Sequence, residues 1–134
     1  RDAKRVSDVK QMQSALDLYA TDKNGYPIDG AAGAPGIVLG GPTAKCISDT
    51  TGFGAIGACA GNTYMANVPS NTTPGGIDYT YRSVDAAGAD CGTGPCIGYS
   101  LRFDLEADTG ELKDGTDALT VPNCTATPGG ITCL

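Results

Sequence analysis

Six cysteines in a chain of 134 residues that has no histidine constrain the possible folds more than any other feature. Twelve, four and eight residues separate the successive pairs of neighbouring cysteines, and none has the two-residue spacing of a zinc knuckle. An even number of cysteines in a short chain indicates a disulfide framework. The sequence therefore predicts three disulfides and a protein that works outside the cytoplasm. The cysteines are Cys46, Cys59, Cys91, Cys96, Cys124 and Cys133.

The pairing of these cysteines stays open at this point. Joining each cysteine to its nearest neighbour in the sequence is the simplest arrangement, because each bond then closes a short loop. Six cysteines nevertheless allow about fifteen pairings, and a metal site or free thiols are the alternatives to disulfides.

The first part of the chain predicts a long amphipathic helix over residues 1–22. Apolar side chains recur there at steps of three and four residues and form one face, which we expect to pack on a sheet. The helix should end near Asn24, because Gly25 can adopt the left-handed conformation and Pro27 cannot continue a helix. The residues of this face are Val6, Val9, Met12, Leu16, Tyr19 and Ala20.

The beginning of this helix is unusual. No capping side chain precedes Arg1, and Arg1, Lys4 and Arg5 place positive charge near the end of the helix dipole that disfavours it. We therefore expect the helix to continue upstream of Arg1 in a longer protein.

The composition changes after the helix. Residues 30–61 contain nine glycines, which predicts a long irregular connection that a Cys46–Cys59 bond could hold in place. Residues 63–69, TYMANVP, predict a short helical turn stopped by Pro69.

The second half has the two-residue period of strands. Apolar and polar side chains alternate over residues 77–83 and 98–106, as in antiparallel strands with one buried face. A third strand is expected around 111–113, and the tail could add an edge strand and a loop closed by cysteines.

These elements predict an α+β fold, in which the helix packs on three to four antiparallel strands. We expect a single domain of residues 1–134. Its segments would be the helix (1–24), the loop (25–76), the sheet (77–122) and a C-terminal disulfide region (123–134).

Charge and residue types exclude several functions. The net charge is −6, and the basic cluster lies on a helix whose other face must be buried, so we expect no direct binding of nucleic acid. Without histidine the chain has no ordinary catalytic triad. We expect neither enzymatic activity nor a cofactor.

Two ligand motifs are weak. Gly52, Gly54 and Gly57 match a dinucleotide-binding pattern, but no parallel strand precedes them and no helix follows, so a flexible loop is the simpler interpretation. An acidic cluster could bind calcium, yet its spacing misses the EF-hand pattern and favours a solvated acidic surface that is partly paired with Arg82 and Arg102. The cluster consists of Asp104, Glu106, Asp108, Glu111, Asp114 and Asp117.

Several stretches together resemble the soluble domain of type IV pilins and of the pseudopilins of type II secretion systems. They are ALDLYATDKNGYP, YMANVPSN, YTYRS, YSLRFDLE and GELKDG. Residues 28–62 match no part of that pattern. The resemblance implies a helix packed on an antiparallel sheet and a C-terminal region bounded by a disulfide, in which Cys133 could also pair with a cysteine other than Cys124.

The resemblance also implies a function. Such subunits are made as precursors in the inner membrane, and an assembly machinery polymerises them into a helical homo-oligomer through an apolar helix, here upstream of Arg1. The chain would then belong to an extracellular pilus that serves adhesion, motility or DNA uptake. We expect Arg1, Lys4 and Arg5 to contact acidic surface on neighbouring subunits.

Two alternatives stay open. The first is a pseudopilin, although the major pseudopilins typically lack disulfides and bind calcium. The second is a free-standing secreted binding module held together by its disulfides.

Overall fold

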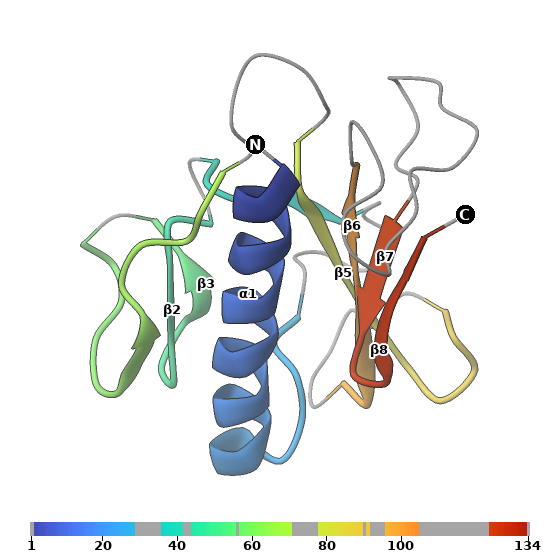
Figure 1. The fold of residues 1–134 in the computed structure, drawn as a ribbon. Helices are drawn as coiled ribbons and strands as arrows, with labels where there is room; N and C mark the ends of the chain where they lie inside the picture. The colour runs from blue at the N-terminus through green and yellow to red at the C-terminus, as the bar shows by residue number, and fades with distance from the viewer. Residues whose placement is uncertain are drawn as a thin grey trace.

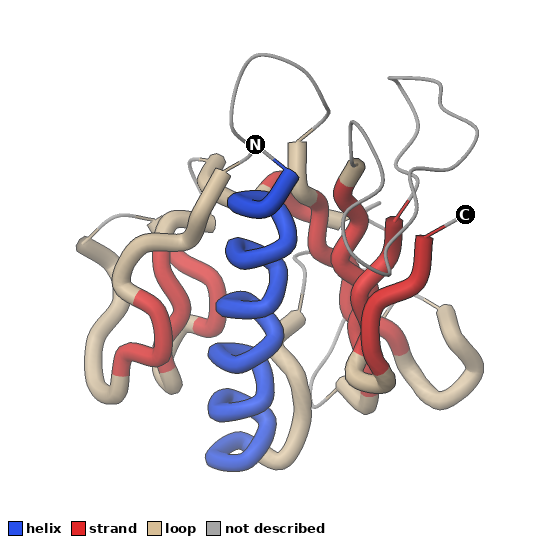
Figure 2. Tube along the Cα trace, in the orientation of Figure 1, coloured by secondary structure: helices blue, strands red, loops and turns tan. Residues whose placement is uncertain are grey.

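The computed structural model describes residues 2–28, 36–41, 44–55, 57–70, 78–89, 91, 96–104 and 124–133. These residues form an α+β fold with one N-terminal helix and antiparallel sheets (Figures 1 and 2). The elements are α1 (Asp2–Lys23), β1 (Ile37–Val38), β2 (Cys46–Ser48), β3 (Gly52–Gly54), β4 (Thr63–Met65), β5 (Thr80–Val84), β6 (Gly98–Phe103), β7 (Cys124–Thr127) and β8 (Gly130–Cys133).

Helix α1 ends where the sequence predicts, but the residue that closes it is not the predicted one. Asn24, not Gly25, adopts the left-handed conformation, with φ of 58°. Asparagine tolerates this conformation better than most residues and can close a helix as glycine does. The chain then turns onto the sheet, where the Tyr26 N–H donates a 2.8 Å hydrogen bond to the carbonyl of Cys96. The Tyr81 hydroxyl donates a 2.6 Å hydrogen bond to the carbonyl of Pro27.

The large sheet has five strands within the described part of the chain, in the order β1-β5-β6-β7-β8, and all neighbours are antiparallel. Strands β5 and β6 confirm the two alternating segments of the sequence. The tail contributes a hairpin, β7 and β8, instead of one edge strand. The strand expected around 111–113 lies outside the described residues.

The expectation of an irregular connection between the helix and the large sheet is wrong. Strand β1 pairs with β5, and β2, β3 and β4 form a second antiparallel sheet in the order β3-β2-β4. The helical turn expected at residues 63–69 is wrong as well, because Thr63–Met65 pairs with β2. Strands of two or three residues are too short to show the alternation of apolar and polar side chains that identifies a strand. Glycine, which is uncommon in strands, makes them still harder to recognise in the sequence.

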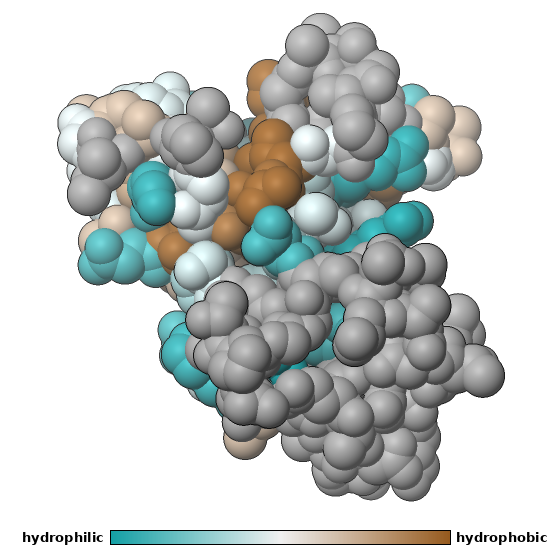
Figure 3. Space-filling view, turned by 90° about the horizontal axis from the view of Figure 1, so that it is seen from above, coloured by the Kyte–Doolittle hydropathy of each residue, from teal (hydrophilic) through white to brown (hydrophobic). Residues whose placement is uncertain are grey.

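The core lies where α1 meets the two sheets. In Figure 1 the small sheet lies on one side of α1 and the large sheet on the other, and α1 contacts both β4 and β7. The Phe53 and Tyr81 rings, one from each sheet, have centroids 4.7 Å apart, so the two sheets share one core. Figure 3 shows hydrophobic side chains gathered near the centre of the face seen from above.

Candidate functional site

The apolar face of α1 is the contact between the helix and the rest of the molecule. Val9, Met12 and Leu16 are fully buried in the core. Val6 and Tyr19 are half-buried and pack against the same core. Five of the six residues predicted for this face therefore lie at the helix–core contact.

A buried polar cluster lies beside this face. Arg5 has no exposed surface and Asp8 is 5 % exposed. The Asp8 carboxylate accepts hydrogen bonds from the Tyr79 hydroxyl at 3.0 Å and from Lys4 Nζ at 2.8 and 2.9 Å. Because Tyr79 belongs to the segment that leads into β5, this cluster joins the first turns of α1 to the large sheet.

The charges of this cluster act on Tyr79. Burial raises the pKa of the Tyr79 hydroxyl, the negative charge of Asp8 and its hydrogen bond raise this pKa further, and the positive charge of Arg5 opposes them. The neutral hydroxyl is therefore a stable donor to Asp8 at all ordinary pH values.

The basic residues predicted to contact neighbouring subunits are not all on the surface. Lys4 is exposed, with 54 % of its side chain accessible, although it also pairs with Asp8. The expectation that Arg5 faces a neighbouring subunit is wrong for this structure, because Arg5 is fully buried. Arg1 lies outside the described residues. Lys4 is thus the described member of the three that lies on the surface.

Three disulfides join neighbouring cysteines. Cys46–Cys59 ties β2 to the segment after β3, Cys91–Cys96 closes the segment that leads into β6, and Cys124–Cys133 joins the two strands of the C-terminal hairpin. Cys133 therefore pairs with Cys124 and with no other cysteine. The three bonds thus tie the small sheet, the entry to β6 and the C-terminal hairpin.

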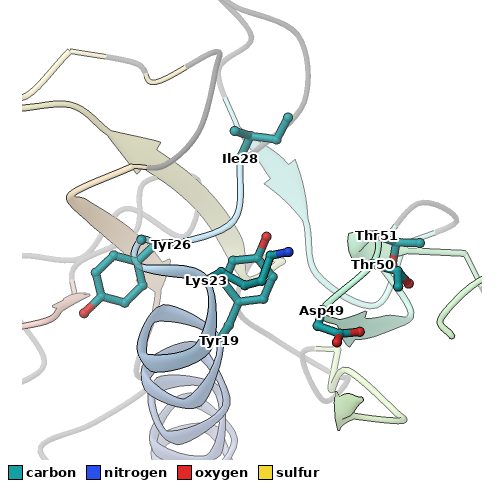
Figure 4. A pocket seen from close by; sticks show the side chains of 8 residues that line it. Tyr19, Lys23, Tyr26, Ile28, Asp49, Thr50 and Thr51 are labelled. Atoms are coloured by element: carbon teal, nitrogen blue, oxygen red, sulfur yellow. The ribbon is translucent and has the colours of Figure 1, made fainter. Parts of the chain in front are cut away.

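A pocket of about 340 Å³ lies between the end of α1 and the turn after β2 (Figure 4). Tyr19 and Lys23 project from the helix, and Asp49, Thr50 and Thr51 lie opposite them. Burial, followed by the charge of Asp49, raises the pKa of the Tyr19 hydroxyl. No sequence pattern indicates this pocket. Its two sides come from separate segments, residues 19–28 and 49–51, which the fold brings together.

The rim of this region carries a second tyrosine–aspartate pair. The Tyr64 hydroxyl donates a 2.6 Å hydrogen bond to Asp22, and this bond is the main cause that raises the pKa of Tyr64 to about 12. The Tyr19 and Tyr64 rings meet edge to face, with centroids 5.9 Å apart. This end of α1 therefore carries hydroxyl, ammonium and carboxylate groups, which can form hydrogen bonds with a polar partner.

The structure does not support the glycine motif, and it describes only one residue of the acidic cluster. Gly52 and Gly54 lie on strand β3, which is antiparallel to β2 and is not followed by a helix, so the glycine pattern has no dinucleotide-binding context. Of the acidic cluster only Asp104 is described, and it is buried. The other five acidic residues lie outside the described part. Among the described residues, no group of three or more potential ligands could hold a metal ion.

Comparisons with known proteins identify no relative. Within the described ranges, no helix has both the length and the apolar character needed to cross a bilayer. No family model matches the chain, and no significant match was found among curated proteins or among solved structures.

Proposed function

We propose that this chain is the globular domain of a filament subunit similar to type IV pilins, and that its function is to polymerise. One observation carries the proposal. In the described part of the chain, the long helix α1 is packed along an antiparallel sheet that ends in a hairpin closed by a disulfide. This arrangement is the one that the pilin-like stretches of the sequence imply.

The location follows from the disulfides. Three disulfides among six cysteines indicate an oxidising environment, outside the cytoplasm. We propose that the domain forms the outer shell of a cell-surface filament, whose use would be adhesion, motility or DNA uptake.

Polymerisation would need an apolar helical segment before Arg1. Identical subunits related by one repeated operation form open helical filaments when the operation does not close a ring. In the proposed filament the apolar segments pack in the centre, and the exposed Lys4 contacts acidic surface on a neighbouring shell domain.

The sequence of the complete gene tests the proposal. We expect codons for about 20 consecutive apolar residues close before Arg1, preceded by a short basic leader. A cleavable secretory signal directly before Arg1 would contradict the proposal and would support a free-standing secreted module.

Charge reversal tests the contact at Lys4. We expect Lys4→Glu in the complete protein to lower filament yield, whereas Lys45→Glu, at another exposed lysine, should not. Because Lys4 also pairs with Asp8, the melting temperature of the globular domain is measured for both variants, and the comparison uses variants that keep the wild-type value. Normal yield with Lys4→Glu would remove this contact from the proposal. Arg5 is unsuitable for the test, because reversing a fully buried charge would damage the fold.

The alternative of a pseudopilin has a separate test. The major pseudopilins typically bind calcium, so a pseudopilin should melt at lower temperature when a chelator removes calcium. We expect the same melting temperature with and without chelator. A clear decrease would favour the pseudopilin.

A further inference from the structure

A polar pocket of about 400 Å³ lies between helix α1 and the turn of the C-terminal hairpin. The helix contributes side chains spaced by three and four positions, which share one face. The hairpin contributes the turn between β7 and β8, and β6 contributes a tyrosine. We call this site the hairpin pocket. The described residues that line it are Lys10, Gln13, Ser14, Asp17, Tyr99, Pro128, Gly129 and Gly130.

The hydroxyl of Tyr99 is the unusual group of the hairpin pocket. Tyr99 is 2 % exposed, and within the described part of the chain its hydroxyl has no hydrogen-bond partner. Its ring is held in place, because the ring centroid lies 4.8 Å from that of Tyr26 and 5.9 Å from that of Tyr81. Buried hydroxyl groups nearly always have a partner, since the loss of hydrogen bonds to water is costly. The Tyr99 hydroxyl is thus a donor that a ligand can use.

This hydroxyl lies at the floor of the hairpin pocket. Burial, followed by the negative charge of Asp17, raises the pKa of the Tyr99 hydroxyl, and the Gln13 amide lowers it. Asp17 and Gln13 are therefore close to the hydroxyl, and both line the pocket. Gln13 donates a 3.1 Å hydrogen bond to the carbonyl of Thr127, and this bond holds the helix against the hairpin.

The hairpin pocket carries one charge of each sign. Lys10 and Asp17 are both exposed and lie two turns apart on the helix. Neither forms an ion pair with another described residue. The Asp17 carboxylate interacts with the hydroxyl of Tyr26 through a hydrogen bond, but a carboxylate has about four acceptor positions and can bind a further donor. The pocket thus offers a cation, an anion and a buried hydroxyl.

Two other classes of ligand fit this pocket less well. A saccharide packs the C–H face of its ring on an exposed aromatic ring, whereas Tyr99, the aromatic residue among the described lining residues, is buried. A metal ion such as calcium needs several oxygen ligands, and Asp17 is the one acidic side chain among those lining residues. Charges of both signs in one small pocket instead favour a small ligand that itself carries both charges.

We propose that the hairpin pocket binds a free α-amino acid in its zwitterionic form. The ammonium group of the ligand binds the carboxylate of Asp17. The carboxylate of the ligand accepts hydrogen bonds from the Tyr99 hydroxyl and from the flexible side chain of Lys10, and such charge-assisted bonds are the strong ones. The side chain of the ligand lies toward the open side of the pocket.

Both walls of the pocket are held in place by the fold. The Cys124–Cys133 disulfide closes the hairpin, and the turn is closed by a 3.3 Å hydrogen bond from the Gly129 N–H to the Thr127 hydroxyl. The opposite wall is a regular helix. A site whose walls are ordered before binding avoids part of the entropic cost of binding.

Equilibrium binding of the 134-residue chain to free amino acids, followed by isothermal titration calorimetry, tests the proposal. The probes are the standard L-amino acids, the N-acetyl and carboxamide forms of the tightest binder, and glucose. We expect at least one amino acid to bind, and each blocked form to bind about tenfold more weakly, since each has lost one charged group. We expect glucose not to bind.

Three variants locate the site. Tyr99→Phe should weaken binding by about tenfold without lowering the melting temperature, because the hydroxyl has no partner among the described residues. Asp17→Asn should weaken binding by a similar factor. Lys10→Gln should weaken it less, because an exposed ammonium group is well solvated.

Asp22→Asn is the matched control for Asp17→Asn. Asp22 is also an exposed aspartate of α1 that accepts a hydrogen bond from a tyrosine hydroxyl, but it lies outside the hairpin pocket. Lys45→Gln, at an exposed lysine outside the pocket, is the control for Lys10→Gln. Both control variants should bind as the wild type does.

Several results would overturn the proposal. They are the absence of binding by every amino acid, a blocked form that binds as tightly as its parent, and equal losses in Asp17→Asn and Asp22→Asn. A lower melting temperature of Tyr99→Phe with unchanged binding would assign the hydroxyl a purely structural role. Glucose binding tighter than that of the amino acids would identify a saccharide site instead. None of these outcomes depends on whether the chain forms filaments.

Discussion

The Tyr79 hydroxyl donates a 3.0 Å hydrogen bond to the Asp8 carboxylate, and this bond joins α1 to the large sheet inside the molecule. We predict that Tyr79→Phe lowers the free energy of unfolding by about 1 to 3 kcal/mol, because it leaves a buried carboxylate with one donor fewer. Urea unfolding of both proteins at neutral pH measures the difference.

The matched control is Tyr64→Phe. It removes the same kind of bond, a tyrosine hydroxyl to an aspartate, but at the surface, where water replaces the lost donor. We expect no measurable change in the free energy of unfolding. Equal costs for the two variants would show that the Tyr79–Asp8 bond has no special role in holding the helix.

The buried face of α1 gives a second prediction. Leu16 is fully buried, whereas Leu18, two residues later on the same helix, is 56 % exposed. Leu16→Ala should lower the free energy of unfolding by about 2 to 5 kcal/mol, and Leu18→Ala should change it by less than about 0.5 kcal/mol. Similar costs in a denaturant titration would contradict the orientation of α1 described above.

The disulfides should differ in their contribution to stability. A bond that closes a longer loop restricts the unfolded chain more, so Cys46–Cys59, with a sequence separation of 13, should stabilise more than Cys91–Cys96, with a separation of 5. Replacing the first pair by alanine should cost about 3 kcal/mol and the second about 2 kcal/mol. Calorimetric melting of the two double variants gives the order, and the reverse order would contradict the prediction.

The tyrosines predict a loss of stability in alkali. The pKa values of Tyr79 and Tyr99 are raised chiefly by burial, and that of Tyr64 is raised to about 12 chiefly by its hydrogen bond to Asp22. A tyrosine in an unfolded chain loses its proton near pH 10. The folded state therefore binds more protons above that pH, and its stability falls as pH rises from about 10 toward 12.

Phenolate absorbance measures this effect directly. In the folded chain, part of the signal of the six tyrosines should appear only above about pH 11, whereas in urea all six should ionise near pH 10. A single folded-state titration centred near pH 10 would contradict the hydrogen bonds and burial assigned to Tyr64, Tyr79 and Tyr99.

Periodic elements could be predicted from the sequence, and short ones could not. The helix and strands β5 and β6 show a clear period over five or more residues, which is long enough to distinguish helix from strand. Strands β1 to β4 have two or three residues each and lie among glycines, so only their pairing partners define them. The interpretation of residues 30–61 as an irregular connection failed for that reason.

The burial of Arg5 could not be predicted for a different reason. A charged residue in the first turns of an amphipathic helix is normally exposed, because burial requires partners that compensate its charge. Here the charges of Arg5 and Asp8 both act on the hydroxyl of Tyr79, which is 71 positions from Asp8 in the sequence. Local patterns do not reveal a contact across that separation.

The most direct test of the central claim is the location of this domain on cells that express the complete gene. Filaments sheared from the cell surface should contain the domain, gold-labelled antibody against it should mark the filaments along their length, and deletion of the gene should remove the label. A domain that stays entirely in the soluble extracellular fraction as a monomer, with unlabelled filaments, would contradict the claim that this chain is a filament subunit.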